Sequence, residues 1–231
     1  EIMILQKLNH PNVIKYIDHV IKGSHVILIT ELHGSEWTPS MVAVNLRPNK
    51  HAFTTSATET VSSNELSKQM SSCDLFECID ERIPEKQAKR IYAQIALAVD
   101  YLHQSDIVHR DLKDQNVVID VRYNIKIIDF GSSAYIPKQE CDYFTQFNGT
   151  VYFASPEIAK NELYRGPEAE MWAMGVLLYV MVFGEYPFRH AAEIIRGDFR
   201  MPFHVSLESD CNREGIVLYC SFCRFLMSLF Y

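Results

Sequence analysis

His109-Arg110-Asp111-Leu112-Lys113-Asp114-Gln115-Asn116, followed by Asp129-Phe130-Gly131, is the part of the sequence that decides the fold. Each of these polar, acid-bearing blocks is bounded by apolar, β-prone residues. Val117–Ile119 lies between the blocks, and Ile125–Ile128 runs directly into the second one. Two short strands joined by a turn at residues 122–124 are therefore predicted, and such a hairpin would bring both blocks to one cleft.

Three oxygen-bearing side chains, those of Asp111, Asn116 and Asp129, would then lie around this cleft. Magnesium takes hard oxygen ligands and keeps one or two protein groups beside the phosphates of its substrate. A further carboxylate can accept the proton of a hydroxyl group. The set therefore suits phosphate transfer from a magnesium-bound donor to a hydroxyl acceptor. The alternative is a loop whose acidic residues share no function.

Both blocks resemble the catalytic loop and the metal-binding loop of eukaryotic protein kinases. The resemblance implies that Asp111 is the catalytic base and that Asn116 and Asp129 are the magnesium ligands. It also implies that Lys113 steadies the transferred phosphate, as in serine/threonine kinases, and that Thr150 contacts Asp111 and Lys113. ATP and Mg²⁺ are then the expected cofactors. Proteins or peptides with serine or threonine acceptors are the expected substrates of this phosphotransferase.

The resemblance extends from Glu1 to about Pro202, apart from one insert. It implies an α+β fold of the protein-kinase type, which is bilobal, with a partial small β lobe and a mainly helical large lobe. Residues 1–231 would form one incomplete kinase domain. Its expected parts are a remnant of the small lobe with the hinge (1–33), a Ser/Thr-rich insert (34–72) and a large lobe that diverges after about residue 203 (73–231).

The first residues are predicted to form the end of an amphipathic helix, Glu1–Leu8, with Ile4, Leu5 and Leu8 on one face. Pro11 disfavours helical conformation in the residue before it, which ends the helix. By resemblance this run is the kinase C-helix, and Glu1 is the glutamate that pairs with a lysine of the third strand. The alternative is a surface glutamate at a frayed helix start.

Two β-prone runs follow, Val13–Asp18 and His25–Thr30, with a turn between them. They match two strands of the small lobe. Thr30 falls at the gatekeeper position, and Glu31 and His33 fall in the hinge, where backbone groups would meet adenine. The resemblance assigns two later residues to the nucleotide site: Asp74, which would meet the ribose, and Val118.

A long helix is predicted from Pro84, a residue type that suits the first helical turn, to about His103. Ile91, Ile95 and Leu102 lie on one apolar stripe along it. The segment matches the central helix of the kinase large lobe. Its expected role is that of a scaffold for the catalytic loop.

By resemblance, the glycine-rich loop and the lysine-bearing strand of a kinase should precede Glu1. We therefore expect the sequence to be a fragment of a longer protein or the product of an incomplete gene model. We also expect this polypeptide alone to be inactive, although it belongs to an active family. The alternative function is a catalytically silent, kinase-like binding or scaffold module.

Residues 132–153 resemble a kinase activation segment. Gln146 takes the place of the threonine that is phosphorylated in the family, and Thr145 lies one residue earlier. Arg110 would pair with a phosphate if one were present. Activity that does not depend on phosphorylation at this place is therefore predicted.

Glu170 stands where the family usually has aspartate, and its carboxylate is expected to hold the backbone of His109 and Arg110. The stretches 165–168 and 170–172 resemble those of PAS-domain-containing kinases. A regulatory sensor domain is therefore expected elsewhere in the full-length protein.

The net charge of -7 gives no electrostatic reason to expect nucleic acid or an anionic membrane as a partner. The apolar run at 217–231 is short for a membrane span. The six cysteines show no disulfide-framework spacing, which favours a reducing compartment. We therefore expect the protein in the cytoplasm, with the nucleus as the alternative.

Overall fold

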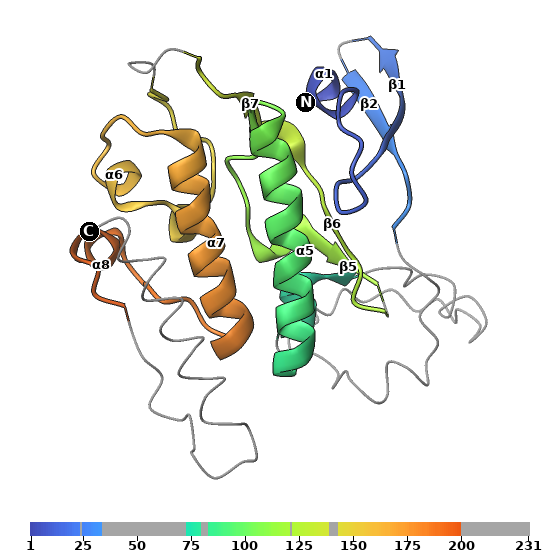
Figure 1. The fold of residues 1–231 in the computed structure, drawn as a ribbon. Coiled ribbons are helices and arrows are strands. Elements are labelled where there is room, and N and C mark those ends of the chain that lie inside the picture. Colours follow the sequence, from blue (N-terminus) through green and yellow to red (C-terminus); the bar gives the residue numbers. More distant parts are fainter. Residues whose placement is uncertain (24, 34–72, 80–82, 121, 139–142, 200–231) are drawn as a thin grey trace, which may run out of the picture.

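The computed structural model describes residues 1–23, 25–33, 73–79, 83–120, 122–138 and 143–199. The predicted insert at 34–72, the predicted divergence after residue 203 and the apolar run at 217–231 lie outside these residues. Figure 1 shows a small part, built from an N-terminal helix and two strands, beside a larger part dominated by two long helices. This arrangement agrees with the predicted bilobal α+β fold.

The small part consists of α1 (Ile2–Leu5), β1 (Tyr16–Lys22) and β2 (His25–Thr30). The two strands pair antiparallel. Gly23 between them takes a φ of 63°, a left-handed conformation that glycine adopts without steric penalty. β2 has the predicted bounds, whereas β1 runs from Tyr16 to Lys22 and not from Val13 to Asp18.

α1 ends earlier than predicted but keeps the predicted apolar face. The helix stops at Leu5 instead of reaching Leu8, yet Ile4, Leu5 and Leu8 are all buried. The N–H of Leu8 donates to the carbonyl of Leu5 at 3.2 Å. This i→i−3 bond is of the 3₁₀ type, so the predicted last turn is present in a tightened form.

The two parts are joined through β6 (Ile125–Ile127). The N–H of Ile14 donates to the carbonyl of Ile127 at 3.0 Å, and the N–H of Ile127 donates to the carbonyl of Asn12 at 2.9 Å. Val13 and Ile127 form an isolated parallel bridge. These bonds explain why β1 begins later than predicted, because Val13 pairs with the large part rather than with β2.

Two long helices, α5 (Glu85–Gln104) and α7 (Gly166–Phe183), form the frame of the large part. They lie side by side in Figure 1. The predicted stripe of Ile91, Ile95 and Leu102 on α5 is fully buried. Apart from Glu168 and Glu170 near its start, α7 is mainly apolar, and it is mostly buried, as expected for a helix inside a core. Within the described part of the chain, no helix has both the length and the apolar character needed to cross a bilayer.

Short strands support the loops between these helices. The predicted hairpin is present, because β5 (Val117–Ile119) pairs antiparallel with β6. β3 (Cys73–Asp74) pairs antiparallel with the other edge of β5, and β4 (Ile107–Val108) pairs antiparallel with β7 (Ala134–Tyr135). The remaining elements are the helices α4 (Leu75–Ile79), α6 (Pro156–Ala159) and α8 (Ala191–Arg196) and the 3₁₀ helices η1 (Asp114–Asn116), η2 (Phe130–Ser132) and η3 (Val151–Phe153).

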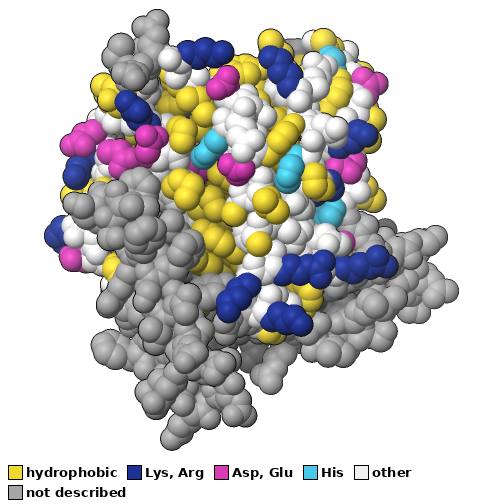
Figure 2. Space-filling model, in the orientation of Figure 1, with side chains coloured by type: hydrophobic (Ala, Val, Ile, Leu, Met, Phe, Trp, Pro, Cys, Tyr) yellow, Lys and Arg dark blue, Asp and Glu magenta, His cyan; other side chains and the backbone are white. Residues whose placement is uncertain are grey.

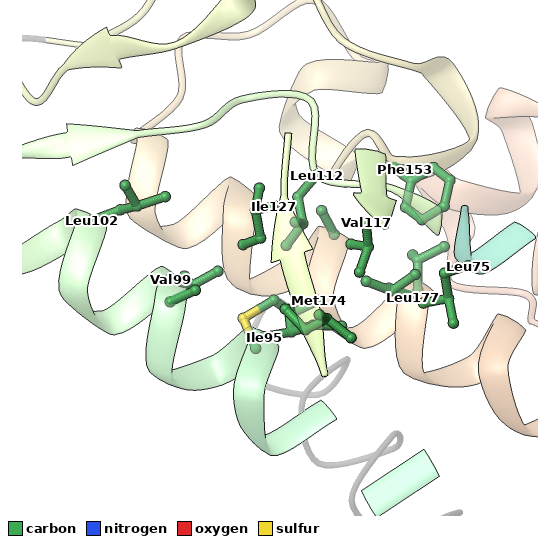
Figure 3. Packing of buried hydrophobic residues seen from close by; sticks show 14 of the residues in the cluster. Leu75, Ile95, Val99, Leu102, Leu112, Val117, Ile127, Phe153, Met174 and Leu177 are labelled. Atoms are coloured by element: carbon green, nitrogen blue, oxygen red, sulfur yellow. The ribbon is translucent and has the colours of Figure 1, made fainter. Parts of the chain in front are cut away.

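The main hydrophobic core lies beneath the β5–β6 hairpin. Figure 3 shows Leu112, Val117 and Ile127 packed with Met174 and Leu177 of α7. All five side chains are buried. Burying a large aliphatic side chain contributes about 1.5–3 kcal/mol, so the loop that contains Leu112 is firmly fixed from below.

The face shown in Figure 2 has a mixed surface. Hydrophobic side chains gather over α5 and α7, and charged side chains of both signs surround them. Leu97 on α5 is 59% exposed. The outward side of α5 is therefore not purely polar.

Candidate active site

A carboxylate on α7 accepts hydrogen bonds from the backbone of the predicted catalytic loop. Glu170 is 3% exposed. Its Oε1 accepts hydrogen bonds from the backbone N–H groups of His109 at 2.8 Å and Arg110 at 3.0 Å. Arg110 takes a left-handed backbone conformation with a φ of 67°, which a non-glycine residue keeps only where its surroundings hold it. Glu170 therefore makes the contacts expected from the sequence, despite being longer than aspartate.

The second oxygen of Glu170 makes a contact that sequence reasoning missed. Oε2 lies 2.7 Å from Nε2 of His103, near the end of α5. The longer side chain thus connects α7 both to α5 and to the catalytic loop. No local pattern could reveal the pair, because the two residues are 67 positions apart.

Asp111, Lys113, Asn116 and Thr150 form one hydrogen-bonded group. The Thr150 hydroxyl donates to Oδ1 of Asp111 at 2.8 Å, and Nζ of Lys113 lies 2.8 Å from Oδ2 of Asp111 and 2.9 Å from Oγ1 of Thr150. Nδ2 of Asn116 donates to the backbone oxygen of Asp111 at 2.8 Å and to Oδ2 at 3.0 Å. Because this nitrogen faces Asp111, the amide oxygen is the atom that Asn116 can offer to Mg²⁺, which prefers such ligands.

Asp129 follows the end of β6, on a segment that is bonded to the catalytic loop. It has a left-handed φ of 60°, and its Oδ1 accepts the N–H of Gly131 at 3.2 Å. The residue before it, Ile128, donates its N–H to the carbonyl of Asn116 at 3.0 Å and accepts from Nε2 of His109 at 2.9 Å. The two predicted magnesium ligands therefore lie on segments that are bonded to each other.

Glu1 borders the same loop from the small part. A Cβ atom placed on Gly131 would lie 3.1 Å from Oδ1 of Asp129 and 4.0 Å from Oε2 of Glu1. The carboxylates of Glu1 and Asp129 therefore flank the same glycine. The structure thus places the predicted C-helix glutamate beside the predicted metal-binding loop.

The side chains of the predicted hinge residues help to join the two parts. Oε1 of Glu31 accepts the N–H of Lys15 at 2.7 Å and lies 2.8 Å from Nζ of Lys126. Partial burial raises the pKa of Glu31, but the bonds from Lys126 and Lys15 outweigh it and lower the pKa below its ordinary value. Nε2 of His33 lies 3.0 Å from the backbone oxygen of Asn124. The side chains of both predicted hinge residues therefore have partners within the protein, and the backbone N–H of Glu31 donates to the carbonyl of Lys15 at 3.0 Å.

The other predicted nucleotide-site residues are held by backbone pairing. Thr30 ends β2 opposite Tyr16, and Asp74 in β3 lies opposite Val118 in β5. Oδ1 of Asp74 also accepts the N–H of Glu77 at 2.9 Å, which is the arrangement of a helix N-cap. Asp74 therefore begins α4, a structural role next to its predicted one at the ribose.

A second carboxyl group of the catalytic loop, that of Asp114, is buried and 1% exposed. It accepts the N–H of Gln115 at 3.1 Å and lies 3.5 Å from the hydroxyl of Tyr186. Burial raises the pKa of Asp114 despite the bond from Gln115. Burial, together with the Asp114 carboxylate, raises the pKa of Tyr186 to about 12. Sequence reasoning missed this pair, whose members are 72 positions apart.

Arg110 has partners that do not require a phosphate. Its Nε donates to the carbonyl of Ser132 at 2.7 Å. Its guanidinium carbon lies 5.0 Å from the centre of the Phe144 ring, within the range of a cation–π interaction. Phe144 forms a backbone bridge with Tyr164, and the two rings stack at 5.5 Å. Arg110 therefore has an aromatic partner, Phe144, which lies two residues before Gln146 in the sequence. The sequence did not predict this contact.

A family model for the protein kinase domain matches residues 1–218. The chain belongs to the protein kinase family. This kinase chain is 35% identical over 222 residues to the PAS domain-containing serine/threonine-protein kinase of Mus musculus, covering 95% of the chain and 13% of the mouse protein. It is 44% identical over 138 residues to serine/threonine-protein kinase ppk6 of Schizosaccharomyces pombe, covering 59% of the chain and 17% of that protein. It is 33% identical over 190 residues to the carbon catabolite-derepressing protein kinase of Candida tropicalis, covering 81% of the chain and 24% of that protein.

The matches confirm the identification of a kinase domain similar to those of PAS-domain-containing kinases. The kinase chain spans only 13% to 24% of the length of these three curated relatives. The roles assigned to its individual site residues stay predictions. What the structure adds is that Asp111, Lys113, Asn116 and Thr150 are in direct contact.

Proposed function

We propose that the full-length protein containing this chain transfers the γ-phosphoryl group of ATP to serine or threonine hydroxyls of proteins. The proposal depends most on the group around Asp111. Its side chain is 12% exposed and is held between Thr150 and Lys113. The matching relatives named serine/threonine-protein kinases support this class of acceptor.

In this reaction Asp111 orients the acceptor hydroxyl and takes its proton as the new oxygen–phosphorus bond forms. Lys113, 2.8 Å from Asp111, places a positive charge next to the transferred group. Asn116 and Asp129 would hold Mg²⁺ through their oxygen atoms. When bound, Mg–ATP supplies the phosphoryl group, and ADP leaves with the electron pair of the broken bond. Thr150 keeps the Asp111 carboxylate in a fixed orientation at 2.8 Å.

For the nucleotide, we propose backbone contacts with adenine at Glu31 and His33 and a contact of Asp74 with the ribose. Glu1 would pair with a phosphate-binding lysine of the small lobe.

The similarity to a relative named as PAS domain-containing supports a regulatory sensor domain elsewhere in the full-length protein. The scattered cysteines support the cytoplasm as its location. Fluorescence microscopy of the tagged full-length protein tests the location, and a signal confined to a secretory compartment would contradict it.

The test of the function is ATP-dependent phosphorylation of a serine/threonine peptide library by the full-length protein. Asp111→Asn should lower transfer by about 10²–10⁴, the usual contribution of a general base. Asp100→Asn, which changes an exposed carboxylate on α5, serves as the matched control and should leave transfer unchanged. A protein that binds ATP but transfers no phosphate would instead be the silent binding module.

A further inference from the structure

Tyr186 lies in a loop whose path is fixed on both sides. The loop begins at Gly184, which ends α7 in a left-handed conformation with a φ of 71°. Phe188 is fully buried, and its ring stacks on that of Trp172 with the ring centroids 5.7 Å apart. The position of Tyr186 is therefore set by α7 and the core.

The ring of Tyr186 packs on the segment that follows Thr150. It stacks on the ring of Tyr152, with centroids 5.3 Å apart and an interplanar angle of 23°. It meets the ring of Phe153 edge-on, at 5.9 Å and 87°. Both geometries are favourable for aromatic pairs. Because Thr150 donates to Asp111 at 2.8 Å, these contacts support the segment that positions the proposed base.

The other end of Tyr186 reaches the catalytic loop. Its hydroxyl lies 3.5 Å from Oδ2 of Asp114, the residue after Lys113. The phenol O–H is the donor to this carboxylate. Tyr186 thus connects the two segments that carry Thr150 and Lys113, the partners of Asp111.

The segment that Tyr186 supports also presents apolar surface beside Asp111. Val151 is 60% exposed and Tyr152 is 47% exposed. In the proposed reaction, an acceptor held at Asp111 would lie near this segment, because Thr150, the residue before it, donates to Asp111 at 2.8 Å. The orientation of the Tyr152 ring would then affect the acceptor.

We propose that Tyr186 is a positioning residue for the protein acceptor. Its ring holds the segment with Val151 and Tyr152 in a fixed position relative to Asp111. The proposal rests on the proposed kinase function. Among the described residues, Tyr186 contacts Tyr152, Phe153 and Asp114 rather than the proposed magnesium ligands. Loss of its ring should therefore weaken acceptor binding and leave ATP binding unchanged.

The experiment compares Tyr186→Ala and Tyr186→Phe in the full-length protein, with KM measured separately for the acceptor peptide and for ATP. Tyr186→Ala should raise the acceptor KM about tenfold, while the ATP KM stays within about twofold. Tyr186→Phe keeps the stack on Tyr152 and should restore the acceptor KM to within about threefold. Phe183→Ala is the matched control, because it removes the Tyr179–Phe183 ring pair at the same end of α7.

A second variant covers the case in which Tyr186→Ala does not fold. Tyr152→Ala removes the same stack at an exposed position and should raise the acceptor KM by a similar factor. The double variant should be no worse than either single one, because the two rings act as a unit. The inference is overturned if the acceptor KM of Tyr152→Ala equals that of the wild type, or if ATP and acceptor KM rise together. A wild-type protein that transfers no phosphate would overturn the proposed function as well.

Discussion

Replacing Glu170 by glutamine should loosen the catalytic loop without changing the shape of the side chain. The carboxylate accepts two backbone N–H groups at 2.8 and 3.0 Å and lies 2.7 Å from His103. Glutamine keeps one carbonyl oxygen for the two N–H groups but removes the negative charge. Both bonds then become neutral ones, and the amide nitrogen turns toward His103.

The expected magnitude follows from these two backbone bonds. Hydrogen bonds to a charged group contribute about 1.5–3 kcal/mol, whereas neutral ones contribute about 1 kcal/mol. Each bond to Glu170 should therefore lose about 0.5–2 kcal/mol, and the loop should lose about 2 kcal/mol in total. A loss of that size makes local opening about 30-fold more frequent.

The measurement is hydrogen exchange of the backbone amides of His109 and Arg110 in the full-length protein. These amides should exchange about 30-fold faster in Glu170→Gln. The matched control is Glu168→Gln on the same helix, where the exposed Glu168 lies 3.9 Å from Arg165 and such surface pairs contribute little. Equal exchange rates in the two variants would refute the reasoning, because they would show that the charge of Glu170 does not hold the loop.

Two further predictions concern Arg110 and the junction of the two parts. Phe144→Ala should lower kcat/KM about tenfold, because Arg110 loses a cation–π partner. The neighbouring Thr145→Ala should change kcat/KM by no more than about twofold. A much larger loss for Thr145→Ala would show that phosphorylation of Thr145 matters. The lowered pKa of Glu31 means that folding favours its ionised form, which therefore stabilises the folded protein. This contribution is fully present above the ordinary pKa of 4.5 and is lost as the pH falls through the lower pKa of the folded state. Acid unfolding followed by circular dichroism should show that Lys126→Met lacks this contribution, and an identical pH dependence in the variant would show that Lys126 is not its source.

The parts of the fold that could be predicted are those specified by local pattern. Ile91, Ile95 and Leu102 repeat at helical spacing, and α5 buries them as expected. The start of β1 could not be predicted, because the residues from Val13 onward are β-prone whether they pair with β2 or with β6. Val13 and Ile14 join the large part because Ile127, which is distant in sequence, is hydrogen-bonded to Asn12 and Ile14.

The same distinction applies to the candidate site. Asp111, Lys113 and Asn116 lie within one short loop, so their types and spacing are enough to predict a shared role. The partners that hold this loop come from elsewhere: His103 through Glu170, and Tyr186 through Asp114. Their contacts depend on how α5 and α7 pack, and a linear pattern contains no record of that packing.

The sharing of β6 between the two parts has a mechanical consequence. Ile127 is hydrogen-bonded to Asn12 and Ile14 of the small part, while the next residue, Ile128, is bonded to Asn116 and His109 of the catalytic loop. A rotation of the small part relative to the large part would therefore strain hydrogen bonds that are one residue away from those holding the catalytic loop.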